Sequence, residues 1–135
     1  MKSIVRRFAI AFAATACVFL LLDAAWLTTM AARLYRPALG HVMRADFDVL
    51  AAAIFYAIYL CGVVFFAVSP SLSGRDALLR GAFFGLVAYA TYDLTNQATV
   101  IGWPWHVTAV DLCWGAFVTA ASAWAGYRAS HAGGA

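Results

Sequence analysis

The sequence predicts an all-α integral membrane protein, an antiparallel four-helix bundle. Three observations predict it: the composition, the apolar stretches, and the turn residues between them. Of the 135 residues, 65% are hydrophobic and 11% are charged, and the mean hydropathy is +0.83. A water-soluble domain carries about a quarter charged residues. Water therefore cannot be the main solvent of this chain, and any charged side chain within an apolar stretch needs an explanation.

Four stretches are long and apolar enough to cross a bilayer as helices, which takes about 20 residues each. They are Phe8–Met30, Val49–Val68, Ala77–Thr99 and His106–Tyr127. The spans and their short connections account for nearly the whole chain, so we treat residues 1–135 as a single four-span domain.

The first span follows the basic segment MKSIVRR, as the apolar core of a signal peptide would. Its apolar run is too long for that role, contains Asp23, and is not followed by a small-residue cleavage site. We therefore predict a retained helix, ended by a loop that contains Pro37 and Gly40.

The later spans are separated by turn-forming residues. The second span ends at SPSLSG, and the tight turn GWPW separates the third span from the fourth. The third span carries Gly81 and Gly85, and a Gly-x-x-x-Gly pair lets two membrane helices approach closely.

Lysine and arginine predict the orientation, because basic residues concentrate in cytoplasmic segments. With the N-terminus inside, six of the nine basic residues lie on the cytoplasmic side and three on the other. We therefore expect a multi-pass protein of the bacterial inner membrane with both termini in the cytoplasm.

Three aspartates lie within the spans: Asp23, Asp93 and Asp111. A carboxylate at membrane depth costs several kcal/mol unless it is paired, hydrated or protonated. At about 1.5 Å of rise per residue, all three lie roughly 8 to 10 Å from the same, outer side of the bundle. The sequence therefore predicts one layer of acids, gathered in a shared pocket in the outer half of the membrane.

Helical spacing predicts that small and polar residues face the inside of the bundle next to these acids. The third span offers Tyr89, Tyr92 and Asn96 on the face of its glycines, and the second offers Tyr56 and Tyr59. Stripes of small residues are predicted to line the fourth and first spans, through Gly115, Thr119, Ser122 and Gly126 and through Ala9, Ala13 and Ala16.

Two tryptophans, Trp26 and Trp114, each follow an aspartate by three residues, which places an indole next to a carboxylate on a helix. The two Asp-x-x-Trp tetrads raise a duplicated helix pair as an explanation, although two copies are weak support for it.

The order of motifs along the chain resembles a family of small bacterial inner-membrane proteins catalogued as domain of unknown function 2177. The motifs are LLDAAWL, YRPALG, FYAIY, TYDLTN, GWP and DLCWG. TYDLTN (91–96) is the most specific of them. The resemblance implies a four-span membrane protein and carries no assigned activity.

Carboxylates next to tryptophan and tyrosine suit a cationic or amphipathic ligand, because the acids supply charge and the rings supply cation–π attraction. The candidate ligand- or ion-binding residues are Asp23, Trp26, Arg36, Tyr56, Tyr59, Tyr89, Tyr92, Asp93, Asn96, Asp111 and Trp114. These residues favour a small transporter or binding protein, with membrane lipids as its surroundings.

Two alternatives stay open. One is a membrane-embedded enzyme acting on a lipid-like substrate, although no catalytic residue is assigned. The other is a structural or accessory subunit in which the acids anchor hydrogen bonds. The sequence also leaves open whether the protein forms a homo-oligomer.

The sequence predicts no cofactor, no metal site and no nucleic-acid partner. The positive charges lie at the ends of segments rather than in a basic stripe. The cysteines Cys17, Cys61 and Cys113 lack metal-binding spacing, and we expect them to be small buried side chains.

Overall fold

A computed structural model of the protein describes residues 1–132 and contains helices and turns, with no strand in that part of the chain. The last three residues of the expected domain, 133–135, lie outside the described residues. In chain order the elements are α1 (Lys2–Met30), η1 (Ala31–Tyr35), α2 (Arg36–Leu39), α3 (Val49–Val63), η2 (Val64–Val68), α4 (Gly74–Thr99) and α5 (Trp105–His131). Both η segments are π-helical and continue the preceding helix without a break.

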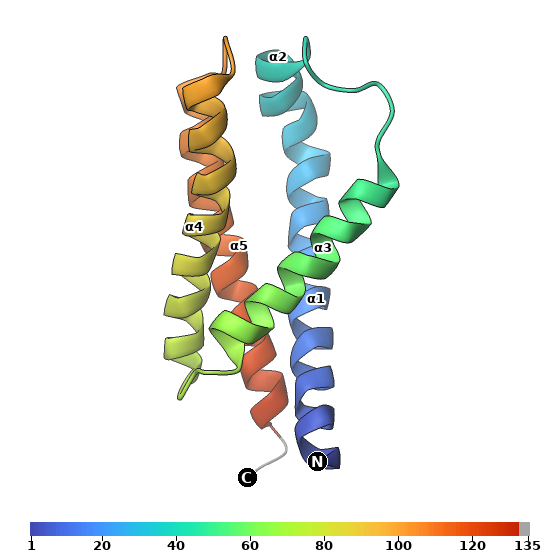
Figure 1. Cartoon of the computed structure of the whole chain (residues 1–135), viewed down its shortest axis with the longest axis vertical. Helices are drawn as coiled ribbons and strands as arrows, with labels where there is room; N and C mark the ends of the chain where they lie inside the picture. The colour runs from blue at the N-terminus through green and yellow to red at the C-terminus, as the bar shows by residue number, and fades with distance from the viewer. Residues whose placement is uncertain (133–135) are drawn as a thin grey trace.

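The four long helices form an antiparallel bundle, which confirms the expected fold class (Figure 1). α1 and α4 run towards the end that holds α2 and the α4–α5 turn, which we call the upper end. α3 and α5 run back to the lower end, where the N-terminus lies. α4 packs along α5, and α1 packs on α5 as well, whereas α3 crosses the bundle diagonally.

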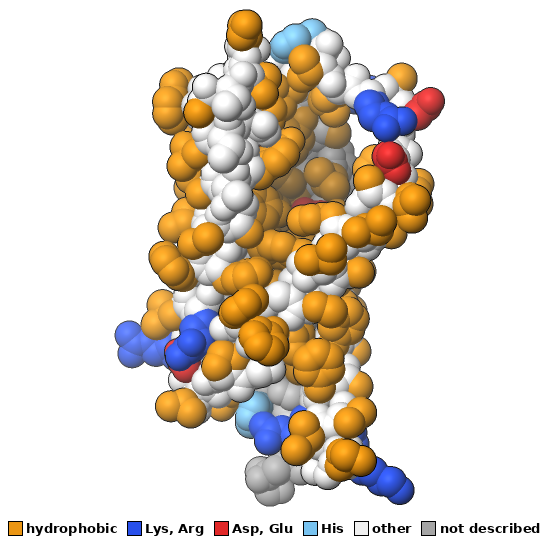
Figure 2. All heavy atoms as spheres, viewed as in Figure 1, with side chains coloured by type: hydrophobic (Ala, Val, Ile, Leu, Met, Phe, Trp, Pro, Cys, Tyr) orange, Lys and Arg blue, Asp and Glu red, His pale blue; other side chains and the backbone are white. Residues whose placement is uncertain are grey.

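Three of these helices are long and apolar enough to cross a membrane: Lys2–Leu39, Val49–Val68 and Trp105–His131. α4 has 26 residues, enough by length, but its Gly, Tyr, Asn, Gln and charged residues lower its hydropathy. That α4 forms a fourth membrane span therefore stays a prediction. The surface of the molecule is largely apolar, and Lys and Arg gather near its two ends (Figure 2).

Glycines bring α4 and α5 into close contact. A Cβ atom added at Gly85 would lie 2.1 Å from the backbone oxygen of Gly115, and one at Gly81 would lie 2.7 Å from the Cβ of Ala123. α5 also approaches α1, because a Cβ at Gly126 would lie 2.1 Å from Thr15 Oγ1. The backbones can pack this closely only because these positions have no side chain.

The buried stripe of α1 differs from the expected one. It runs through Ala11, Thr15, Phe19 and Asp23 in steps of four residues, whereas Ala9 and Ala13 are exposed. The prediction was wrong for Ala9 and Ala13, whereas Ala16 packs against the larger apolar cluster. α1 is apolar on all sides, so residue size alone does not mark its packing face.

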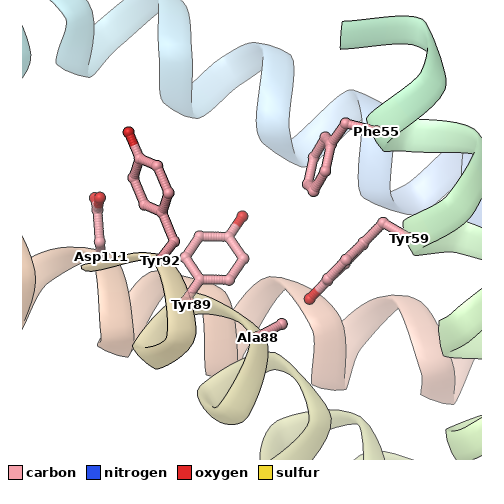
Figure 3. A pocket seen from close by; sticks show the side chains of 6 residues that line it. All are labelled: Phe55, Tyr59, Ala88, Tyr89, Tyr92 and Asp111. Carbon is pink, nitrogen blue, oxygen red and sulfur yellow. The ribbon is translucent and has the colours of Figure 1, made fainter. Parts of the chain in front are cut away.

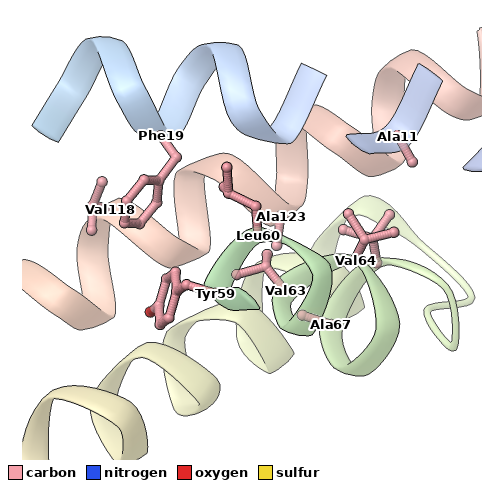
Figure 4. Close-up of a cluster of buried hydrophobic side chains, with 10 residues drawn as sticks. Ala11, Phe19, Tyr59, Leu60, Val63, Val64, Ala67, Val118 and Ala123 are labelled. Atoms are coloured by element: carbon pink, nitrogen blue, oxygen red, sulfur yellow. The ribbon is translucent and has the colours of Figure 1, made fainter. Parts of the chain in front are cut away.

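Two apolar clusters enclose the middle of the bundle. The larger cluster joins Phe19 of α1, Val63 and Val64 of α3 and η2, and Val118 of α5 in the lower half (Figure 4). A small upper cluster joins Leu39, Trp103 and Val107. Along α1 and α5, Asp23 and Asp111 lie between the residues of these two clusters.

Candidate functional site

Asp111 on α5 is the acid at the centre of the polar layer. Its side chain is buried and accepts a hydrogen bond of 2.5 Å from the hydroxyl of Tyr35. Trp26 Nε1 donates in turn to the oxygen of that hydroxyl, at 2.9 Å. Asp111, Tyr35 and Trp26 therefore form a hydrogen-bonded chain that connects α5 to the upper part of α1 and to η1.

The π-helical segment η1 determines where Tyr35 points. Nine residues of regular α-helix turn through about 900°, which would put Tyr35 on the face opposite Trp26. The wider π turn over Ala31–Tyr35 reduces that rotation, so both side chains reach the same hydrogen-bonded chain. Pro37 falls in the first turn of α2, where a missing N–H is tolerated. The helix therefore continues to Leu39 instead of ending at Met30 as expected.

Asp23 on α1 has a partner set of its own. It accepts a short hydrogen bond from the Tyr56 hydroxyl of α3 and a long one, 3.5 Å, from Trp114 Nε1 of α5. The rings of Trp26 and Trp114 stack in parallel, 4.3 Å between centroids and 8° between planes. The indole of each Asp-x-x-Trp tetrad therefore interacts with the aspartate of the other tetrad. Trp114 donates directly to Asp23, and Trp26 is linked to Asp111 through the hydroxyl of Tyr35.

Asp93 on α4 is completely buried, and neither carboxyl oxygen has a hydrogen-bond donor among the described residues. Tyr89, one turn before Asp93 on α4, packs on Gly115, and Asp111 lies one turn before Gly115 on the antiparallel α5, so the two carboxyl groups face each other across the α4–α5 contact. The structure therefore brings two of the three acids together. The expectation that all three share one pocket is wrong for Asp23, because Asp23 is held by Tyr56 and Trp114.

A cavity of about 340 Å³ opens beside this pair, lined by Phe55, Tyr59, Ala88, Tyr89, Tyr92 and Asp111. The α3 rings lie on one side, the α4 side chains lie on the other, and Asp111 comes from α5 (Figure 3). Its walls are largely aromatic, with a single carboxyl group. Figure 2 shows the molecule hollowed between α4 and α3 in its upper half, where α3 runs away from α4.

The remaining predicted site residues lie in different places. Tyr59 is buried and its hydroxyl bonds Thr119 Oγ1 at 2.7 Å, while Tyr92 is 59% exposed at the rim, edge-on to Trp103. Asn96 is half-buried one turn beyond Tyr92. Arg36 is exposed on α2 and is not among the residues that line the cavity.

Sequence reasoning missed Tyr35 and selected its neighbour Arg36 instead. Tyr35 is the first residue of the YRPALG motif, but the segment reads as a proline-containing loop and gives no sign of the π turn that directs its side chain. Sequence reasoning also missed a group of three hydrogen-bonded residues at the upper end of the bundle. There Thr108 Oγ1 accepts from Trp103 Nε1 at 3.1 Å and donates to Gln97 Oε1 at 2.9 Å. Gln97 Nε2 donates to the Trp103 carbonyl at 2.8 Å, which closes the α4–α5 turn.

Within residues 1–132, no group of three or more His, Cys, Asp or Glu side chains is arranged to hold a metal ion. All three cysteines are free and exposed, so the expectation that they are buried was wrong. Their positions on the outer faces of apolar helices agree with lipid-facing surfaces.

Comparison with known proteins gives a family for the chain. A family model described as "Predicted membrane protein (DUF2177)" matches residues 8–128, which include nearly all of the four long helices. Searches of curated proteins and of solved structures find no match. The motifs, the apolar helices and the family model agree, and the chain belongs to this family of predicted membrane proteins.

Proposed function

We propose that this membrane protein is a small transporter or binding protein that takes a cationic, amphipathic ligand into the cavity beside Asp111. The single observation that carries the proposal is a buried carboxyl group at the end of an aromatic cavity within the membrane bundle. Burying a carboxyl group in such a place is costly, and a bound cation would offset that cost.

The chemistry of the lining suits a quaternary or alkylated ammonium group. Asp111 offers the charge, and the ring faces of Tyr59, Tyr89 and Phe55 offer cation–π attraction to a weakly hydrated cation. A compact ammonium head with a few methyl groups fits a volume of about 340 Å³.

The position of the cavity favours an amphipathic ligand over a soluble cation. Its walls come from α3 on one side and α4 on the other (Figure 3), and the surface is hollowed between these two helices on the flank of the bundle (Figure 2). A head group can enter there while an alkyl chain stays among lipid tails. With both termini in the cytoplasm of a bacterial inner membrane, as the basic residues predict, this mouth lies in the outer half of the bilayer.

The test uses the purified protein in lipid nanodiscs with radiolabelled tetradecyltrimethylammonium as the probe. We expect saturable binding above that of empty nanodiscs, and binding at least about tenfold weaker, or about 1.4 kcal/mol, for Asp111→Asn. Tetradecanol, which has the same chain and no charge, should not compete.

Asp46→Asn is the matched control, because it removes an exposed loop carboxylate that does not line the cavity. Equal binding by wild type, Asp111→Asn and empty nanodiscs would contradict the proposal. That result would favour the structural alternative, in which the Tyr–Asp hydrogen bonds only hold the helices together.

A further inference from the structure

Asp93 presents a problem that its neighbours do not solve. The carboxyl group is completely buried, and both of its oxygens lack a donor in the described part of the chain. Such an orphaned acceptor pair is rare, and leaving even one buried polar group unsatisfied costs about 1 to 3 kcal/mol.

Among residues 1–132, no hydrogen bond or salt bridge joins a basic side chain to Asp93. α1 contributes Asp23 and η1 contributes Tyr35, each already in its own hydrogen bond. α3 contributes Tyr56 and Tyr59, which bond Asp23 and Thr119. α4 itself carries Tyr89 and Tyr92, and α5 carries Asp111. In residues 1–132 the salt bridges are Arg44–Asp48 and Arg80–Asp76, both far along the chain from this layer.

A proton supplies the missing donor. Two carboxylates that face each other in a region of low dielectric constant would repel each other strongly, and neither would have a hydrogen to offer. If one is protonated, its O–H donates to the other and the repulsion disappears. Asp111 already accepts a hydrogen bond from Tyr35, so Asp111 has a donor whereas Asp93 has none among the described residues. The proton therefore belongs on Asp93.

We propose that Asp93 stores a proton that it donates to Asp111, and that a cation binding in the cavity displaces this proton, so that one cation is exchanged for one proton. The exchange of a cation for a proton rests on the proposed function, whereas the assignment of the proton to Asp93 does not.

The exchange balances in charge. Before binding, a neutral Asp93 and a charged Asp111 give the pair a net charge of −1. Afterwards two carboxylates and one monovalent cation also sum to −1, so the buried site never gains or loses net charge. Asp93 is not among the residues that line the cavity, whereas Asp111 is. The proton leaves through Asp111 into the cavity, in competition with the cation for the same oxygens.

The proton assignment is tested without any ligand. Infrared spectra of the protein at neutral pH, in ether-linked lipid that has no ester carbonyl, should contain the C=O stretch of a protonated carboxylic acid. The chain has only six acidic side chains, so the background is small. The band should disappear in Asp93→Asn and persist in Asp76→Asn, a control at the lower end. A wild-type spectrum without the band, or a band that survives in Asp93→Asn, overturns the assignment.

The exchange is tested by the pH dependence of tetradecyltrimethylammonium binding in nanodiscs. At pH values where Asp93 is protonated before the cation binds, release of one proton per cation makes wild-type binding about tenfold tighter for each unit rise in pH. In Asp93→Asn the slope should vanish. Calorimetry in buffers of different ionisation enthalpy should report about one proton released by wild type.

The two proposals fail in different ways. Binding of the probe with no pH slope and no proton release overturns the exchange and leaves the proposed function in place. No saturable binding to wild type contradicts the proposed function and the exchange together. The infrared band still decides the proton assignment in that case.

Discussion

At the scale of residues, the site depends on side chains that serve acids on other helices. Trp26 and Trp114 stack on each other, and their indole N–H groups reach towards different acids. Tyr35 lies between Trp26 and Asp111, accepting from one and donating to the other. Because a hydrogen bond to a charged group contributes more than one between neutral groups, Tyr35 is the residue whose loss should be felt most.

Tyr35→Phe tests that statement. The substitution keeps the ring and removes the hydroxyl, which leaves the indole N–H of Trp26 and one oxygen of Asp111 without a partner. We expect the free energy of unfolding, measured by SDS titration in mixed micelles, to fall by about 1 to 3 kcal/mol.

Tyr127→Phe is the matched control. Tyr127 is also half-buried, and its ring stacks on His131 at 4.0 Å, while its hydroxyl has no hydrogen bond in the described residues. Its removal should change stability by less than about 0.5 kcal/mol. A loss in Tyr35→Phe no larger than in this control would show that the Tyr35 hydroxyl does not hold the layer together.

The acids and tryptophans of the layer could be chosen from the sequence, because a charged residue in an apolar span is conspicuous and helical spacing gives its neighbours. The pairing among them could not. Asp23 and Asp93 read alike in the sequence, yet one has two donors and the other has none. That difference depends on how the helices are rotated, which an apolar sequence does not record.

At the scale of elements, glycines position the α4–α5 pair. Gly85 packs on the backbone of Gly115, and Gly115 in turn makes room for the ring of Tyr89, since a Cβ there would lie 2.2 Å from that ring. The close contact of α4 and α5 therefore places Tyr89 at the cavity and brings Asp93 to Asp111.

Gly85→Ala should separate α4 from α5, because its Cβ would lie 2.1 Å from a backbone oxygen that cannot rotate away. We expect a loss of about 1 to 3 kcal/mol in the free energy of unfolding, as for other overpacked sites, measured by the same SDS titration. Val87 lies two residues after Gly85 on an exposed face of α4, and Val87→Ala should change the free energy of unfolding little. Comparable losses in the two variants would argue against a tight glycine contact.

The element bounds agree well with the sequence except where π-helical turns intervene. The second span was predicted at Val49–Val68, where α3 and η2 together lie. The first span was predicted to stop at Met30, but η1 carries the helix on to Leu39. A π turn inserts one residue without a composition signal, so both the extension and the position of Tyr35 required the three-dimensional structure.

At the scale of the whole molecule, the predicted topology depends on α4 crossing the membrane despite its lower hydropathy. α4 lies along α5 for most of its length (Figure 1), and Gly81, Gly85 and Asp93 are buried on α4. A helix whose intramembrane acid is buried against its neighbours can span a bilayer although its sequence is less apolar than theirs.

Cysteine labelling in intact cells tests the topology. In a variant with the three native cysteines replaced by alanine, Ile101→Cys is placed on the α4–α5 turn and Leu72→Cys before α4, both at highly exposed positions. We expect an impermeant thiol reagent added outside the cells to label position 101, and to label position 72 only after permeabilisation. Labelling of both positions from one side would show that α4 does not cross.

The claim at the centre of this account is that the cavity between α3 and α4 binds the head of a cationic amphiphile against Asp111. The most direct measurement is photolabelling in nanodiscs with an alkyltrimethylammonium that carries a diazirine next to its head group. The account predicts adducts on cavity-lining residues such as Phe55, Tyr59 and Tyr89, suppressed by excess tetradecyltrimethylammonium and lost in Asp111→Asn. Adducts spread over the lipid-facing surface, unaffected by the competitor or by that substitution, would contradict it.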